Sequence, residues 1–199
     1  MKNILILISI STFLSCEPKN LISINEDGVL LETYEIDQDS LRHGTTKKYF
    51  KSGQPFEISN YEHGKLNGER LLFYENGQVE IRENYCSGMF CDTLTTYHTN
   101  GIRKFQGVYN HGIMSGLVTG FYETGELKEE VTFLNNIEQG PFKEYHKNGQ
   151  LKWEGSYLDG PNEFGVLSEY DSLGQKIKVM MCDTSAICRT VWPQKDNSI

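Results

Sequence analysis

The sequence predicts an all-β fold, an elongated single-layer antiparallel meander of about five to six β-hairpin repeats of about 24 residues each. Glycines recur along the chain at a step of 24 residues, and aromatic residues recur at the same step. Short strand-forming stretches alternate with turn-forming ones, and no helical spacing of apolar residues follows the first residues. One hairpin cannot bury its own apolar face, so neighbouring hairpins must pack side by side.

Three glycine columns mark the turns of this repeat. The members of the first column lie 24 residues apart, with one final step of 25: Gly53, Gly77, Gly101, Gly125, Gly149 and Gly174. The other two columns are Gly64, Gly88, Gly112, Asn136 and Gly160, and Gly44, Gly68, Asp92, Gly116, Gly140 and Gly165. Asn136 fits such a column because asparagine visits the left-handed backbone region more readily than most residues.

Two aromatic columns keep the same step. They are Tyr49, Phe73, Tyr97, Phe121, Tyr145 and Tyr170, and Tyr61, Tyr85, Tyr109, Phe133 and Tyr157, with Cys182 in the sixth place. We expect the rings of each column to form a ladder along the sheet, in which each ring touches its counterpart in the next repeat.

The segment 69–92 illustrates one repeat. Residues 71–74 (Leu-Leu-Phe-Tyr) are strand formers, and residues 75–78 form a turn in which Asn-Gly supplies two residues that tolerate positive φ. Residues 79–85 then alternate with a period of two, which places every second side chain on one face of a second strand. A wider loop around Gly88 leads to the next hairpin.

The beginning of the chain predicts export. A short positive start is followed by an apolar run from Ile4 to Leu14, which is too short to span a bilayer and fits a secretory signal. The sequence Phe13-Leu-Ser-Cys16 resembles the lipobox of bacterial lipoproteins, which implies cleavage before Cys16 and lipidation of that cysteine. A plain secreted protein or an uncleaved anchor are the alternatives.

These observations divide the chain into four parts. We expect a lipoprotein signal peptide at 1–15, a polar tether at 16–28, the repeat sheet at 29–181, and a C-terminal cap with a loose tail at 182–199. The implied location is a bacterial membrane, to which lipidated Cys16 anchors the exported chain, with the outer membrane or cell surface favoured.

The remaining four cysteines can form two disulfides in three ways. Spacing favours the local pairs Cys86–Cys91 and Cys182–Cys188, and free thiols are the alternative. Because Asp92 replaces a glycine beside Cys91, we expect the first disulfide to hold the loop that glycine no longer holds.

The sequence offers no catalytic constellation, metal site or cofactor site. The net charge of −8 argues against nucleic acid as a partner. The histidine pairs that share a column, His98 with His146 and His63 with His111, lie two repeats apart, too far to share an ion. What remains is a surface, and the candidate contacts for an unknown protein partner are Phe50, Tyr74, Tyr122, Phe105 and Trp153. In the alternative interpretation, these rings pack against the sheet.

The repeat resembles a known family. Phe73-Tyr-Glu-Asn-Gly-Gln-Val-Glu followed by Asn84-Tyr-Cys-Ser-Gly is similar to the MORN repeat, in the bacterial variant of YwqK-type antitoxin components. The resemblance extends over residues 41–178 and implies an elongated meander of hairpins. It also implies roles that range from protein scaffolding and lipid contact to the neutralisation of a partner toxin. Tyr170-Asp171 alone resembles the YD repeat of large surface proteins.

These inferences predict a lipid-anchored, envelope-facing protein-interaction module without catalytic activity. An antitoxin-like or immunity-like protein that neutralises a partner toxin is one alternative. A structural spacer at the cell envelope is another, and it predicts no dependence on exposed aromatic side chains.

Overall fold

The computed structural model describes residues 20–193, and these residues form seventeen β-strands and no helix. The described residues divide into two compact units, of which the first ends at Gly101 and the second begins at Ile102. The strands of the first unit are β1 (Asn20–Glu26), β2 (Val29–Ile36), β3 (Gly44–Tyr49), β4 (Pro55–Glu62), β5 (Lys65–Phe73), β6 (Val79–Cys86), β7 (Met89–Phe90) and β8 (Asp92–Tyr97). Those of the second unit are β9 (Arg103–Asn110), β10 (Ile113–Met114), β11 (Gly116–Phe121), β12 (Leu127–Leu134), β13 (Ile137–Tyr145), β14 (Leu151–Tyr157), β15 (Glu163–Tyr170), β16 (Lys176–Cys182) and β17 (Cys188–Trp192).

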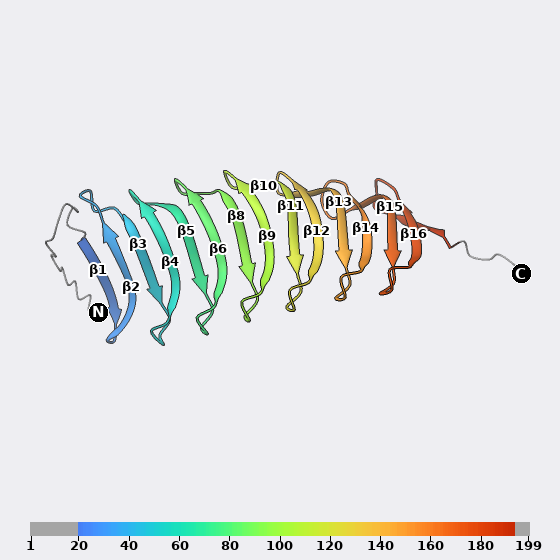
Figure 1. Ribbon diagram of the computed structural model, residues 1–199. Helices are drawn as coiled ribbons and strands as arrows, with labels where there is room; N and C mark the ends of the chain where they lie inside the picture. Colours follow the sequence, from blue (N-terminus) through green and yellow to red (C-terminus); the bar gives the residue numbers. More distant parts are fainter. Residues whose placement is uncertain (1–19, 194–199) are drawn as a thin grey trace, which may run out of the picture. The chain divides into compact units, whose positions relative to one another are not determined.

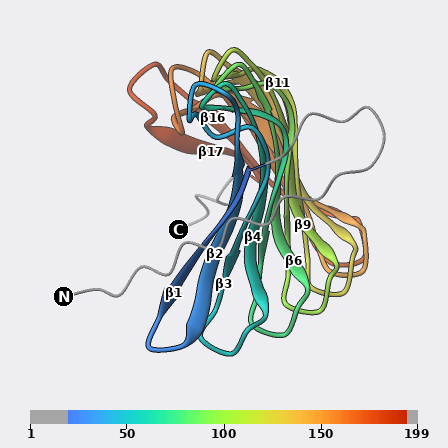
Figure 2. The ribbon, with the colours of Figure 1, turned by 90° about the vertical axis from the view of Figure 1, so that its left-hand side faces the viewer.

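Each unit is an antiparallel meander. In the first unit β1 to β6 pair in chain order, and β6 also pairs with β7 and β8. In the second unit β9 pairs with β10 and β11, and β11 to β17 again pair in chain order. Figure 1 shows the hairpins of each unit following one another along the chain, and Figure 2 shows the strands of the first unit from the end at which β1 lies. The predicted fold class, a meander of antiparallel hairpins, is confirmed.

The tight two-residue turns lie where the sequence predicts the wider loops. Both residues have positive φ in His63-Gly64 (44° and 79°) and in Ser87-Gly88 (51° and 88°), and the same holds for Asn135-Asn136. The flanking residues Glu62 and Lys65 are directly paired. Two positive φ values between paired strands define the type I′ hairpin turn.

The Asn-Gly turns are not type I′ turns, so the prediction that both of their residues adopt positive φ was wrong. At residues 74–78 only Gly77 has positive φ (83°). The N–H of Gly77 donates to the carbonyl of Tyr74, and the N–H of Tyr74 donates to that of Gln78, both at 2.9 Å. This is a type I turn closed by a left-handed glycine in a bulge, which leaves Asn76 in an ordinary backbone region.

The polar tether predicted for residues 16–28 is also corrected. Asn20–Glu26 forms β1, which pairs with β2 along its length. Asp27 and Gly28, with φ of 53° and 81°, make a type I′ turn between the two strands. The signal was present in the sequence as Asp-Gly between two strand-forming stretches.

Backbone hydrogen bonds connect three of the type I′ turns, and the longer loop 158–162 that contains Gly160, to residues earlier in the chain. The N–H of Gly64 donates to the carbonyl of Arg42 at 2.8 Å, and that of Gly88 donates to Leu66 at 2.7 Å. In the second unit Asn136 donates to Met114 at 2.9 Å and Gly160 to Glu138 at 3.0 Å. The donor always lies 22 residues after the acceptor, so each bond joins the connection that follows a bulged hairpin to the residues at the start of that hairpin, and successive connections are linked to one another.

The rings of one column do not form the predicted ladder. Rings 24 residues apart lie two strands apart, about 9.6 Å, because another strand runs between them. The ring contacts found among residues 20–193 include Tyr85 with Phe90 at 4.6 Å and Phe142 with Tyr157 at 4.3 Å between ring centroids, both on neighbouring strands.

The inner face of the first unit is polar. Thr46 pairs with Ser59, Ser59 with Arg70, and Arg70 with Glu83, so these side chains form one row across four strands. Glu57 lies on the same face and is 2% exposed. Its Oε2 accepts from Arg70 at 3.2 Å and from Lys48 at 3.0 Å, while Arg70 also bonds Glu83 at 2.9 Å. A buried ion network therefore occupies the place of an apolar core.

The corresponding row of the second unit is apolar. Val118 pairs with Val131, Val131 with Phe142, and Phe142 with Gly155. Phe142 and Leu167 are buried, and together with Cys182 they form the core cluster. A side chain on Gly155 would meet Phe142 and Leu167 at 2.9 Å, so glycine makes room for the ring.

Gly116 tests the backbone requirement of the third glycine column. Its φ is 96°, and an added Cβ would meet nothing within 4 Å. We expect Gly116→Ala to lower the free energy of unfolding of the second unit by about 1–2 kcal/mol, because a left-handed backbone is strained for an L-residue. Gly116→Asn should lose less. Equal stability of the alanine variant and the wild type in urea unfolding would contradict this explanation of the column.

Candidate functional site

The second unit presents a row of exposed apolar side chains on the face opposite its core. Leu117 pairs with Thr132, Pro141 with Ser156, and Val166 with Met181. Leu117 is 55% exposed, Val166 54% and Met181 48%. We call this set the apolar row, and its members are Val108, Leu117, Pro141, Phe164, Val166 and Met181.

Val108 and Phe164 extend the row. Thr119 on β11 pairs with Gln106 on β9, and Leu117 and Val108 each lie two residues from that pair, so they share its face. Phe164 is paired with Ser156 and is 41% exposed. Val108 also lines a shallow cavity of about 230 Å³ with Asn110, Ile113, Ser115 and Asn135.

The same positions of the first unit are polar. At steps of 24 or 25 residues toward the N-terminus, the columns of Leu117 and Val108 contain the polar residues Thr45, Asn60, Glu69, Asn84 and Thr93. Thr45 pairs with Asn60 and donates to its side chain at 3.2 Å, and Glu69 pairs with Asn84. Because equivalent strands fold with polar residues there, the fold does not require the apolar side chains of the second unit.

Polar side chains border the apolar row on its own face. Glu130 pairs with Lys143, and Lys143 pairs with Glu154. These residues lie two positions from Thr132, Pro141 and Ser156, respectively. An apolar centre with a charged border is the usual composition of a protein-binding surface.

The aromatic residues predicted to contact a partner are half-buried. The hydroxyl of Tyr74 donates to the carbonyl of Tyr97 at 2.8 Å, and that of Tyr122 donates to the carbonyl of Tyr145 at 2.7 Å. Phe50 packs edge-on against Phe56, with 5.2 Å between ring centroids.

Phe105 and Trp153 lie on the inner face of the second unit. Phe105 pairs with Gly120, and Trp153 pairs with Glu144 and packs against the core cluster. None of the five predicted aromatic residues belongs to the apolar row. The signal that identifies the row is the column of Leu117, Pro141 and Val166, which changes from polar to apolar residues halfway along the chain.

The tyrosine hydroxyls that reach the next hairpin allow a direct test. We expect Tyr122→Phe to destabilise the second unit by about 1 kcal/mol, because the Tyr145 carbonyl loses its donor. Tyr74→Phe should have a similar effect on the first unit. Urea unfolding midpoints unchanged by both substitutions would show that these hydroxyls do not join hairpins in solution.

Asp37, His43 and His63 form a cluster of potential ligands in the first unit. One donor atom from each lies within 4.8 Å of the others. Nδ1 of His63 is 2.8 Å from Oδ2 of Asp37, and the rings of His43 and His63 are 5.1 Å apart. Backbone hydrogen bonding from Leu41 lowers the pKa of Asp37. The sequence comparison missed this group because it compared histidines only within columns.

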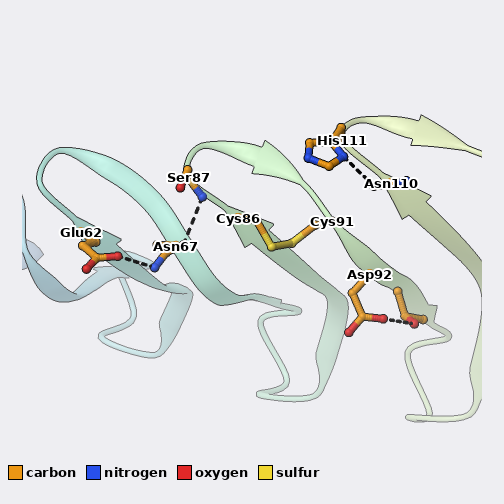
Figure 3. The surroundings of a disulfide bond; sticks show 9 residues. Glu62, Asn67, Cys86, Ser87, Cys91, Asp92, Asn110 and His111 are labelled. Carbon is orange, nitrogen blue, oxygen red and sulfur yellow. Dashed lines mark hydrogen bonds between the residues drawn. A yellow bond between two sulfur atoms is a disulfide. The ribbon is translucent and has the colours of Figure 1, made fainter.

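Both disulfides of the structure join local pairs, Cys86 with Cys91 and Cys182 with Cys188. Figure 3 shows the first of them beside the hydrogen bond from the Ser87 N–H to Asn67 (3.1 Å). Asp92 follows with a φ of 64°. The signal peptide at 1–15, Cys16 and the tail at 194–199 lie outside the described residues.

Two tyrosines of the second unit, Tyr145 and Tyr157, are held in their neutral form. Burial and a hydrogen bond to Glu130 raise the pKa of Tyr145 to about 12. Burial, with several carboxylates nearby, also raises the pKa of Tyr157 to about 12. Such groups donate hydrogen bonds at neutral pH and do not act as bases. Between residues 20 and 193, no helix is long and apolar enough to span a membrane.

Comparison with known proteins identifies the repeat. The model of the MORN repeat variant matches four segments of the chain, residues 42–63, 66–87, 114–135 and 138–159. No curated protein matches the sequence. Each matched segment crosses one bulged turn; the first three end in the type I′ turn that follows, and the fourth ends at Asp159 in the longer loop 158–162. The chain is therefore a repeat protein in which four segments match the MORN repeat variant, two in each unit.

Proposed function

We propose that the protein is a lipid-anchored envelope module that binds another protein through the apolar row of its second unit. The observation that carries this proposal is the contrast between the units. The row has apolar residues that are about half exposed, whereas the equivalent strands of the first unit have polar residues at the same positions. Exposed apolar side chains bordered by charges favour burial against a partner's surface.

The repeat itself supports a binding role. Each hairpin contributes one or two side chains to the row, so a partner can be contacted over several strands without any enclosed pocket. The aromatic side chains predicted as contacts are engaged within the sheet, and we therefore place the partner on the opposite face.

In-cell photocrosslinking tests this role. A photoreactive residue at position 166 should yield a defined adduct with one protein, whereas the same residue at position 69, in the equivalent column of the first unit, should not. The substitutions Leu117→Thr, Val166→Thr and Met181→Asn each introduce a residue found at the equivalent position of the first unit, so variants that carry them should keep the fold. With the photoreactive residue at position 164, the adduct should form in the wild type and fall at least about tenfold in a variant with Leu117→Thr and Met181→Asn. Equal adducts at positions 69 and 166 would contradict the proposal.

The membrane anchor is tested separately. We expect the full chain to be labelled by a fatty acid in cells and to fractionate with membranes, because the sequence before Cys16 resembles a lipobox. Cys16→Ser should abolish both properties, and Cys86→Ser should leave the lipid label in place. A labelled Cys16→Ser variant would show that the anchor lies elsewhere.

A further inference from the structure

We propose that Asp37, His43 and His63 bind one divalent transition-metal ion, of which Zn²⁺ best matches the donors. Two imidazoles and one carboxylate are a common zinc set, with one or more positions left for water. Imidazole ligands disfavour Mg²⁺ and Ca²⁺, which prefer oxygen. This is the one group of three such donors found between residues 20 and 193.

The three ligands come from two loops of the first unit. Asp37 and His43 belong to the connection between β2 and β3, and His63 belongs to the type I′ turn between β4 and β5. The N–H of Gly64 donates to Arg42 at 2.8 Å, so the backbone already holds the turn against the earlier loop. An ion at this place would add a second link between the same two loops.

The carboxylate of Asp37 is oriented before any ion arrives. Its Oδ1 accepts from the N–H of Asp39 at 3.0 Å and from that of Leu41 at 2.9 Å. Its other oxygen, Oδ2, is the one that contacts His63. One oxygen therefore fixes the side chain, and the other is directed at the histidines. Oriented ligands of this kind lose little freedom on binding.

The place of His43 in the repeat points to the same conclusion. Three later members of its column each accept a hydrogen bond from the N–H of the residue 20 positions further on. Asn67 accepts from Ser87 at 3.1 Å, Ser115 from Asn135 at 3.1 Å, and Gln139 from Asp159 at 3.0 Å. At the first position the ring of His43 lies against His63, the residue 20 positions on. A histidine pair replaces the usual polar link between loops.

The movement required for binding is small. Tetrahedral Zn²⁺ with ligands at about 2.0–2.1 Å places donor atoms about 3.3 Å apart. The donor atoms lie within 4.8 Å of one another, and the side chain of His63 is 66% exposed. The histidine rings can therefore turn toward a common ion without disturbing a packed core.

Isothermal titration of the full chain with ZnCl₂, purified without a histidine tag, tests the site. We expect one bound Zn²⁺ per chain at neutral pH. His43→Asn and His63→Asn should each weaken binding at least about tenfold. Both variants should fold, because Asn67 and Asn135 occupy the same columns in later repeats. His111→Asn, in the column of His63, is the matched control and should bind Zn²⁺ as the wild type does.

A spectroscopic readout distinguishes a built site from weak surface binding. Co²⁺ bound by the wild type should give the intense visible bands of four-coordinate cobalt, and Zn²⁺ should displace it. The bands should be lost in His43→Asn and His63→Asn but kept in His111→Asn. Absence of Zn²⁺ binding, equal affinities of all four proteins, or an equal loss in His111→Asn would overturn the proposal.

Discussion

Arg70→Met is expected to lower the free energy of unfolding of the first unit by about 3–5 kcal/mol. The guanidinium is the shared partner of two buried carboxylates, Glu57 and Glu83. Methionine fills similar space but removes the cation that both carboxylates share, and Lys48 remains as the ion-pair partner of Glu57. An uncompensated buried charge costs far more than a surface ion pair contributes.

The two units can be followed separately during unfolding. Both tryptophans, Trp153 and Trp192, lie in the second unit, so tryptophan fluorescence reports that unit while far-ultraviolet circular dichroism reports both. In Arg70→Met, the circular dichroism transition should begin at lower urea concentration than the fluorescence transition. Coincident transitions at the wild-type midpoint would contradict the network's role.

A triple variant provides the control. Glu57→Ile, Arg70→Val and Glu83→Val introduce the residues found in the same columns at positions 81, 118 and 131. Replacing a whole buried ion network by apolar residues is often neutral or stabilising. We therefore expect this variant to recover most of the stability that Arg70→Met loses.

The same network predicts a pH dependence. Burial raises the pKa of Glu57, but hydrogen bonds from Arg70 and Lys48 outweigh it, and the pKa lies below its usual value. Stability from such a depressed pKa is fully present above about pH 4.3, the unfolded value, and is lost as pH falls further. As pH falls from about 4.3 to 2, the wild type should lose stability relative to the variant with Glu57→Ile, Arg70→Val and Glu83→Val. A constant difference over that range, measured by urea unfolding, would contradict the assignment.

Phe142→Ala is expected to destabilise the second unit by about 3–5 kcal/mol. The ring is 4% exposed, stacks on Tyr157 at an angle of 18°, and fills the space that Gly155 leaves open. The sheet has a glycine directly opposite, so the remaining space cannot be filled by a neighbouring side chain. The cavity term should therefore be close to its full value.

Fluorescence should detect this loss directly, because Trp153 packs against the same cluster. Phe142→Leu, which introduces the residue present at position 167 of the column, should lose about 1.5 kcal/mol or less. Leu117→Ala, on the opposite and exposed face, should change stability by about 0.5 kcal/mol or less. Equal effects of Phe142→Ala and Leu117→Ala would show that the inner face is not the core.

The sequence predicts the hairpin repeat because the glycine columns mark fixed backbone needs. Gly64, Gly88 and Gly160 all have positive φ, and such positions tolerate few other residues. The type of each turn was not predictable from Asn-Gly alone. A left-handed glycine serves both a type I′ turn and a bulged type I turn, and the choice depends on the pairing of the flanking strands.

The candidate site was harder to predict because a single sheet has two faces with the same period. Alternation places Leu117 and Val118 on opposite faces but does not say which face is buried. In the first unit the buried inner face has the polar residues Thr46, Ser59 and Arg70, so hydrophobicity does not identify it as the buried face. Comparing whole columns between the units, rather than single residues, would have separated the two faces.

Amide hydrogen exchange measured by NMR tests most directly the claim that successive connections between hairpins are linked to each other by backbone hydrogen bonds. The N–H groups of Gly88, Asn136 and Gly160 lie in connections between hairpins and donate to carbonyls 22 residues earlier, whereas that of Gly77 donates within its own turn, to the carbonyl of Tyr74. We predict strong protection for all four. Protection of Gly77 combined with unprotected exchange at Gly88, Asn136 and Gly160 would contradict this account, because it would show turns that form while the connections between hairpins stay unlinked.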